Sequence, residues 1–156
     1  METQRLTKKD SAQIVEILNR GGVVAFPTDT VYGLAVRYDL KEAILKMKEA
    51  KQRPEIDELV TNGFPTIGIR MPDDDFVLEI INRVGVPLLV PSANLSGQPS
   101  CTTSEEVLKQ LDGRIDAVVL GESGASTAST VCDTTGDELK ILRQGPIKLE
   151  DLEASI

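Results

Sequence analysis

The sequence contains no histidine and no tryptophan, and only 3% of its 156 residues are aromatic. Without histidine, a Ser-His-Asp triad, a Cys-His dyad and any histidine-ligated zinc site are excluded. Chemistry in this protein must therefore use carboxylates, hydroxyls, lysine, arginine, backbone amides or a hard metal ion. With so few aromatics, the core must be built from Val, Ile, Leu and Ala, and a hydrophobic content of 40% is enough for one domain.

Cysteine and long apolar runs are also scarce. The two cysteines, Cys101 and Cys132, do not form a CxxC pair, so no disulfide framework is indicated and we expect a reducing, cytoplasmic location. No apolar run approaches 18 residues, and the first ten residues are polar. We therefore expect neither a membrane span nor a secretory signal.

Basic residues are outnumbered, with 17 against 25 acidic residues and a net charge of −8. Proteins that grip phosphate backbones usually carry a basic surplus, so tight direct binding of tRNA is disfavoured. A compact anion such as ATP needs only a few well-placed cations and backbone amides. The overall charge therefore does not argue against a nucleotide site.

The pattern of apolar residues predicts alternating helices and strands. Helices are expected over 10–20, 39–50, 76–84, 103–111 and a short stretch from 148. Strands are expected over 22–26, 34–36, 66–70, 86–90 and 115–120, and a late hairpin joins STVCD to LKILR. The apolar run 86–90 is typical of a strand covered on both faces. This alternation predicts a single α/β domain over 1–156 with a mixed, twisted sheet.

The common phosphate-binding signatures are missing from the sequence. It contains no GxxxxGK[ST], no GxGxxG after a strand and no DxDxDG loop, which argues against P-loop and Rossmann sites. Four polar segments remain beside predicted strand or helix ends: PTDTVYGL (27–34), KQRP (51–54), PSANLSG (91–97) and the hairpin carrying Ser129 and Arg143. Each alone also fits an ordinary turn, a solvated helix end or a polar pair at a sheet edge.

Taken in order, these segments carry a specific resemblance. GVVAFPTDTVYGL, KQRP, TIGIRMP, VPLLVPSANLSG, STVCD and ILRQG together resemble the YrdC-like family of threonylcarbamoyl-AMP synthases, from about Ile17 to Gly145. The resemblance implies an α/β fold with a twisted open mixed sheet, flanking helices and a large concave face. It also implies a nucleotidyltransferase that joins L-threonine, bicarbonate or CO2 and ATP into threonylcarbamoyl-adenylate and releases pyrophosphate. A downstream tRNA threonylcarbamoyl-transfer complex would then modify the adenosine next to the anticodon.

The same resemblance implies roles for individual residues. Lys51 and Arg53 would be the catalytic cations that face the ATP phosphates. Contacts to L-threonine are expected from Thr30, Tyr32, Val90 and Ser129, and contacts to ATP from Arg53, Ser92, Asn94 and Arg143. Mg2+ is expected to arrive with ATP and bridge its phosphates, without a dedicated protein metal site.

One departure from the family pattern falls after KQRP. Family members usually continue with an Asn-Pro-Leu strand, a helix and a Trp-Pro-Gly-Pro-x-Thr segment, which supplies a substrate-contacting threonine and arginine, whereas this sequence runs directly into EIDELVTNG. We expect a segment to be omitted within 53–58 rather than lost, because losing a central strand and helix would exceed a domain's stability margin. Omission predicts a Cα–Cα step there far above the ordinary ~3.8 Å. The other interpretation is a reduced family member.

Two alternative functions stay open. The closest is a YciO-like paralogue with the same fold and a different small substrate. Hydrogenase-maturation carbamoyltransferases contain a related domain, but no acylphosphatase or zinc-finger segment accompanies it here. The other alternative is a non-catalytic RNA-binding module, which the net charge of −8 disfavours.

Overall fold

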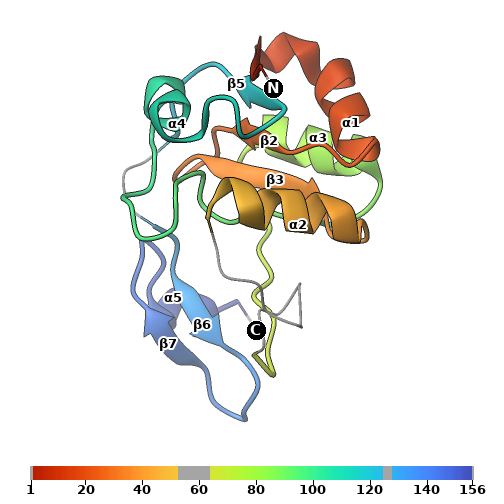
Figure 1. Ribbon diagram of the computed structural model, residues 1–156. Coiled ribbons are helices and arrows are strands. Elements are labelled where there is room, and N and C mark those ends of the chain that lie inside the picture. The colour runs from red at the N-terminus through yellow and green to blue at the C-terminus, as the bar shows by residue number, and fades with distance from the viewer. Residues whose placement is uncertain (1, 53–63, 125–127, 156) are drawn as a thin grey trace.

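The computed structural model describes residues 2–52, 64–124 and 128–155 (Figure 1). The predicted break within 53–58 lies outside these residues. The helices are a 3-10 turn, η1 (Lys8–Asp10), α1 (Ser11–Asn19), α2 (Lys41–Ala50), α3 (Asp75–Val84), α4 (Ser104–Leu111) and α5 (Leu149–Glu153). The strands are β1 (Gln4–Leu6), β2 (Val24–Phe26), β3 (Gly33–Arg37), β4 (Leu88–Leu89), β5 (Ala117–Val119), β6 (Val131–Asp133) and β7 (Lys140–Arg143). None of the described helices is long and apolar enough to cross a membrane.

Within the described residues, five strands form one mixed sheet in the order β1-β5-β2-β3-β4. β1 and β2 both pair with β5 in parallel, whereas β3 pairs antiparallel with β2 on one side and with β4 on the other. The register places Val24 opposite both Ala35 of β3 and Ala117 of β5. The predicted α/β fold with a mixed sheet is therefore confirmed.

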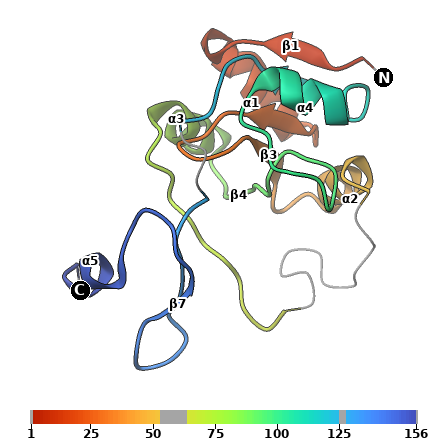
Figure 2. The same ribbon diagram turned by 90° about the vertical axis from the view of Figure 1, so that its left-hand side faces the viewer.

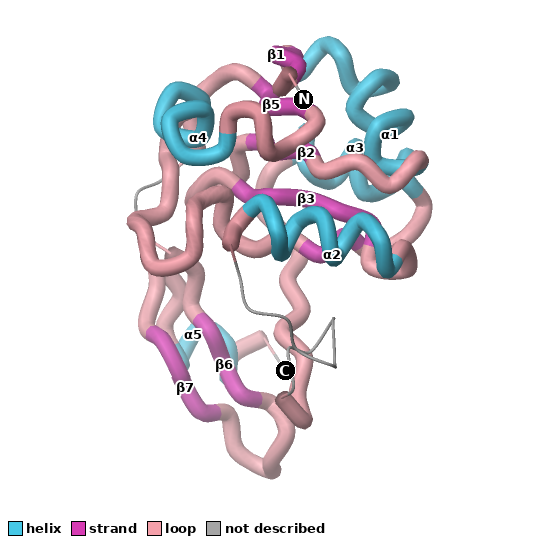
Figure 3. Tube along the Cα trace, viewed as in Figure 1, coloured by secondary structure: helices cyan, strands magenta, loops and turns pink. Residues whose placement is uncertain are grey.

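Helices cover both faces of this sheet, as Figure 3 shows. Successive strand residues point to opposite faces, so Val23 and Ala25 share one core cluster with α2 and α4. Val24 and Phe26 point the other way, into a cluster with α1 and α3. The core on each face is almost entirely aliphatic, which agrees with the composition.

Two predicted strands differ from the structure. TIGIR, residues 66–70, has no regular secondary structure and is exposed, because no described strand lies beside it to complete the backbone hydrogen bonds. The run 86–90 contributes only the two half-buried residues of β4, at one edge of the sheet. The expectation that it is covered on both faces was therefore wrong.

The helix predicted over 39–50 begins at Lys41, and Asp39 forms an ion pair in front of it. Its carboxylate accepts hydrogen bonds from Arg37 Nε at 3.0 Å and from the terminal guanidinium nitrogen at 2.7 Å, while the N-cap of α2 is Leu40. The Arg37 hydrogen bond holds the pKa of Asp39 below its usual value. The bend between β3 and α2 is thus fixed by a side-chain pair rather than by a helix cap.

The late hairpin forms as predicted but stands apart from the main sheet. β6 and β7 pair antiparallel as a separate two-stranded sheet, in which Val131 lies opposite Arg143 and a bulge separates Val131 from Cys132. Both views show the hairpin and α5 extending away from the five-stranded sheet (Figures 1 and 2).

Tyr32 is the largest fully buried side chain and ties the first polar loop to β5. Its single O–H proton is shared between the carbonyl oxygens of Val119 and Gly121, which lie 2.8 and 2.9 Å from the hydroxyl oxygen. Burial raises the pKa of Tyr32 to about 12, because the ionised phenolate would be poorly solvated there. The tyrosine therefore acts as a neutral donor that fixes the end of β5.

We predict that Tyr32→Phe lowers the free energy of unfolding by about 1–2 kcal/mol, because the buried carbonyl of Val119 loses a hydrogen-bond donor. Urea denaturation followed by circular dichroism measures the change. Tyr38→Phe is the matched control, since Tyr38 is 44% exposed, and it should leave stability unchanged. Equal effects in the two variants would contradict the anchoring role of Tyr32.

Candidate functional site

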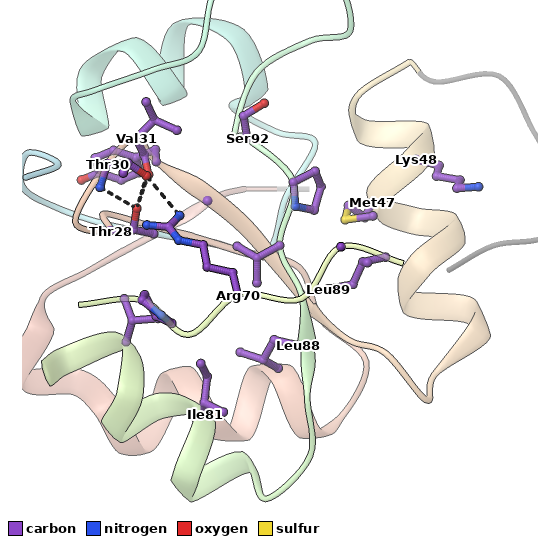
Figure 4. A pocket seen from close by; sticks show the side chains of 17 residues that line it. Thr28, Thr30, Val31, Met47, Lys48, Arg70, Ile81, Leu88, Leu89 and Ser92 are labelled. Atoms are coloured by element: carbon purple, nitrogen blue, oxygen red, sulfur yellow. Dashed lines mark hydrogen bonds between the residues drawn. The ribbon is translucent and has the colours of Figure 1, made fainter. Parts of the chain in front are cut away.

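A pocket of about 320 Å³ lies beside the end of the sheet where β3 and β4 pair (Figure 4). One part of its wall is polar and is formed by Thr28, Thr30, Arg70 and Ser92. The opposite part is apolar, and its side chains come from α2, α3 and the β4 region: Met47, Val77, Ile81, Leu88, Leu89 and Val90. A concave site of this mixed character suits a small ligand that carries both polar and apolar groups.

The polar wall is organised by a chain of hydrogen bonds. The Thr28 hydroxyl donates to the Val31 carbonyl at 2.7 Å, so the Thr30 hydroxyl must be the donor in the 3.2 Å contact between the two threonines. Thr30 Oγ1 in turn accepts from Arg70 at 3.1 Å. Both threonines are buried, so their orientation is fixed before any ligand arrives.

Arg70 lies in the irregular segment 64–72, and its side chain contacts the two hydrogen-bonded threonines through Thr30. Its guanidinium also pairs with the carboxylate of Asp29, which accepts a weaker 3.4 Å bond from the backbone amide of Asp73. The Arg70 side chain remains 41% exposed. A guanidinium carries five N–H donors, so Arg70 has donors left for a carboxylate or phosphate in the pocket.

The loops 27–34 and 91–97 are joined through their backbones. Gly33 and Ser92 form an antiparallel bridge, Leu34 N donates to Pro91 O at 2.8 Å, and Ala93 N donates to Tyr32 O at 2.8 Å. Gly33 is required at this crossing because a Cβ atom there would lie 2.4 Å from Val90 Cγ1. The two predicted loops therefore meet along one side of the pocket.

Lys51 lies behind the second loop rather than in the pocket wall. Its side chain is 2% exposed, and its ammonium donates to the carbonyl oxygens of Ser92 and, at 2.6 Å, Asn94. The backbone of the same residue accepts from Ser96 N at 2.9 Å. Lys51 thus holds loop 91–97 against the end of α2, while its predicted contact with phosphates stays a prediction.

Asn94 supports the same loop from within. Its side-chain amide donates to the carbonyl oxygens of Leu95 and Gln98, both at 2.8 Å. Its Oδ1 atom is buried and has no partner among the described residues. This geometry agrees with a loop-holding residue and leaves the predicted ATP contact of Asn94 untested.

Ser129 and Arg143 come together as the hairpin register predicts, but not in the pocket wall. Arg143 Nε donates to the Ser129 carbonyl at 3.0 Å, and both residues lie on the hairpin. Of the predicted threonine and ATP contacts, Thr30, Tyr32, Val90 and Ser92 line the pocket, while Asn94, Ser129 and Arg143 are not among its lining residues. Arg53 lies outside the described residues.

No role was predicted for Arg70 from the sequence, although it lies within TIGIRMP, a segment of the family resemblance. The sequence feature that could have identified Arg70 is its charge, which stands out in the predicted strand 66–70. Lys48 was also overlooked; it is 3% exposed and lines the pocket from α2. Among the residues described, no group of three or more Cys, Asp or Glu side chains is arranged to hold a metal ion.

We predict that Lys51→Met lowers the free energy of unfolding by about 2–3 kcal/mol, because the buried carbonyl of Asn94 and the half-buried carbonyl of Ser92 lose a charged donor. Chemical denaturation measures the loss. The exposed Lys41, at the start of the same helix, gives the control Lys41→Met, which should have little effect. If Lys51→Met left stability unchanged, the anchoring role would be wrong.

Comparison with known proteins adds a family match. The Sua5_yciO_yrdC family, described as "Telomere recombination", matches residues 16–59 and 54–145. The chain is 34% identical to "Threonylcarbamoyl-AMP synthase" of Bacillus subtilis, over 99% of this chain and 59% of that protein. It is 31% identical to "Threonylcarbamoyl-AMP synthase" of Vibrio campbellii, over 88% of this chain and 100% of that protein.

A solved structure agrees in fold. The crystal structure of P. abyssi Sua5 complexed with L-threonine superposes with a TM-score of 0.87 at 26% identity, over 100% of this chain and 61% of that one. This chain thus spans about three fifths of the length of two of these proteins.

The alignments also show an internal difference in length. The Bacillus alignment has 204 positions, but 99% of this chain is about 154 residues, so about 50 positions of the relative have no counterpart here. The Vibrio alignment gives a similar excess, 186 positions against about 137 residues. The two matched parts of the family meet at residues 54–59, which places the difference where the sequence departs from the pattern.

Proposed function

This chain belongs to the Sua5/YciO/YrdC family, and from that membership we propose that it forms L-threonylcarbamoyladenylate from L-threonine, bicarbonate or CO2, and ATP. The observation that carries the proposal is the polar wall of the pocket, where Thr30 and Arg70 are hydrogen-bonded beside the loop that contains Ser92. Relatives that are 34% and 31% identical to this chain are named threonylcarbamoyl-AMP synthases, which supports this activity.

The substrate amino acid has groups that fit this wall. The remaining N–H donors of Arg70 offer a two-point contact for the α-carboxylate, and the buried Thr30 hydroxyl lies next to it. Arg70 is already oriented by Asp29 and Thr30, so little side-chain freedom is lost when a carboxylate binds. The apolar wall, which includes Val90, would receive the methyl group of threonine.

The proposed reaction needs no covalent intermediate with the protein. The threonine amine adds to CO2 and releases a proton to give a carbamate, and a carbamate oxygen then attacks the α-phosphorus of ATP. The bond from that phosphorus to the bridging oxygen breaks, and pyrophosphate leaves. The protein aligns the two anions, and the Mg2+ that enters with ATP offsets charge on the phosphates, together with cations such as Lys48 in the pocket wall.

The proposed contacts to the nucleotide come from loop 91–97 and from the hairpin of β6 and β7. Ser92 presents a hydroxyl at the pocket, on a loop that Lys51 and Asn94 hold from behind. Arg143 and Ser129 would close on the nucleotide from the hairpin, and the product would pass to the machinery that modifies tRNA. Arg53, two residues after Lys51 in the sequence, would add a second cation to the phosphates.

The difference in length favours a second candidate function, in which the protein binds L-threonine without adenylating it. About 50 aligned positions of the Bacillus relative have no counterpart here, and any substrate contacts they make are missing. Isothermal titration with L-threonine, run beside an assay for threonine-dependent pyrophosphate release, separates the two. Binding without pyrophosphate release would support the second candidate and contradict the first.

We predict that Arg70→Gln weakens L-threonine binding by about 10- to 100-fold, because a charge-assisted pair with the carboxylate contributes roughly 1.5–3 kcal/mol. Titration calorimetry measures the affinity whether or not turnover occurs. Arg114→Gln, at an exposed arginine outside the pocket, is the matched control and should bind normally. Unchanged threonine affinity in Arg70→Gln would remove this residue from the site.

We predict that Arg143→Ala raises the KM for ATP about tenfold and changes the KM for L-threonine little, because its guanidinium would contact only the nucleotide. Initial rates of threonine-dependent pyrophosphate release provide both constants, and Arg53→Ala tests the other predicted cation in the same assay. Lys140→Ala, on the same strand, controls for loss of a surface charge. Wild-type rates in Arg143→Ala would place the residue outside the site.

A further inference from the structure

Asp29 is the residue that fixes Arg70 beside the pocket. One oxygen of its carboxylate accepts a hydrogen bond from the Arg70 guanidinium, and the other accepts the 3.4 Å bond from Asp73 N. Among the described residues, the hydrogen bonds of segment 64–72 are made by Arg70 alone, to Asp29 and Thr30. The part of the pocket wall that this segment forms therefore depends on the ion pair.

The backbone of Asp29 is itself held in place by its neighbours. The Thr28 hydroxyl accepts a hydrogen bond from Thr30 N at 3.1 Å, which closes the turn around Asp29. Gly124 N donates to Thr28 O at 2.8 Å, and a Cβ atom on Gly124 would lie 2.9 Å from Asp29 O and 3.1 Å from its Cα. Gly124 thus packs directly on the Asp29 backbone, and the carboxylate is presented to Arg70 from a fixed position.

This ion pair places two opposite charges at the polar end of the pocket. Arg70 lines the pocket whereas Asp29 does not, so the aspartate acts on a ligand through its charge and not as part of the wall. Its side chain is 25% exposed, and its two described hydrogen bonds leave acceptor capacity, since a carboxylate has about four lone-pair sites. Another cation, Lys48, lines the pocket from α2, and Figure 4 shows it apart from Arg70.

A ligand interacts with these two charges according to its own charge. A carboxylate that pairs with Arg70 is repelled by Asp29, because the two acids share one guanidinium. An α-amino acid carries an ammonium group two bonds from its carboxylate carbon, and attraction between that ammonium and Asp29 offsets the repulsion. The pair therefore favours a zwitterion over an anion of the same shape, because it disfavours the wrong ligand as well as binding the right one.

We propose that Asp29 is a specificity-determining residue of this pocket, which selects zwitterionic α-amino acids over carboxylate anions such as hydroxy acids. It acts in two ways: it holds Arg70 in place, and it sets a negative charge beside the α-ammonium of the ligand. This inference rests on the proposed function, because it takes the carboxylate of L-threonine to bind Arg70. It goes further in naming the charge that excludes acids without an amino group.

The experiment titrates the full chain with L-threonine and with the hydroxy-acid analogue in which a hydroxyl replaces the α-amino group. Calorimetry should show that the unmodified protein binds L-threonine at least about tenfold more tightly than the analogue. Asp29→Asn keeps the shape of the side chain and removes its charge. It should reduce this ratio about tenfold, by weakening L-threonine and strengthening the analogue, whereas a merely structural defect would weaken both ligands together.

Two further variants separate the charge of Asp29 from other effects. Asp29→Glu retains the carboxylate and should keep most of the ratio between the two ligands. Asp75→Asn removes an exposed acid at the first residue of α3 and should leave the ratio at its unmodified value. All titrations are run at one low ionic strength, because salt screens partly exposed charges, and a thermal melt of each variant verifies that it is folded.

The proposal is wrong if Asp29→Asn leaves the ratio unchanged, or if the unmodified protein binds both ligands equally well. If threonine-dependent pyrophosphate release accompanies either result, the proposed reaction stands and only this inference fails. A ratio that depends on Asp29 without any pyrophosphate release has the opposite meaning, since it contradicts the reaction and supports this inference. If the unmodified protein binds neither ligand, both proposals are overturned.

Discussion

The buried ammonium of Lys51 is the constraint on which the site depends. A charged group that is 2% exposed must have its hydrogen bonds satisfied, and here the carbonyl oxygens of Ser92 and Asn94 accept them. Those two carbonyls belong to the loop that also pairs with Gly33. The position of one side chain at the end of α2 therefore determines where loop 91–97 meets loop 27–34.

Next to the junction of these two loops, the pocket has one polar wall and one apolar wall. The polar wall is rigid because each hydroxyl has a defined partner: Thr28 donates to the Val31 carbonyl, Thr30 to Thr28, and Arg70 to Thr30. The apolar wall comes from helix side chains such as Met47 and Ile81 and from β4. Hydrogen bonds to the polar wall would orient the charged end of a ligand. Its apolar part would contact side chains that make no directional hydrogen bonds.

The same pocket is also where the sheet is incomplete. Residues 68–72 contribute one wall and β4 another, but no described strand pairs with the free side of either. The exposed Ile69 and Met71 are the outward face of the segment whose inward face presents Arg70. The structure of the sheet and that of the pocket are therefore linked, because residues 68–72 line the pocket and pair with no described strand.

Local sequence patterns were sufficient to predict most of the helices and strands. Periodic apolar residues identified α1 to α4, and Gly85, at φ +78°, ended α3 where predicted, since only glycine adopts that conformation without strain. The loops 27–34 and 91–97 were found because polar residues clustered where apolar runs stopped. These features follow from local spacing and turn chemistry, which a sequence carries directly.

Only the tertiary structure decided which of these residues share a surface. The pattern of TIGIR is that of a strand, yet a strand requires a partner backbone, and whether one is present is not a local property. The sequence predicts that Lys51 faces phosphates, but only the folded structure shows that its ammonium donates to two carbonyls 41 and 43 residues away. Arg70 was part of a quoted motif without a role, because its pairing with Thr30 joins residues 40 apart, and only folding brings such distant residues together.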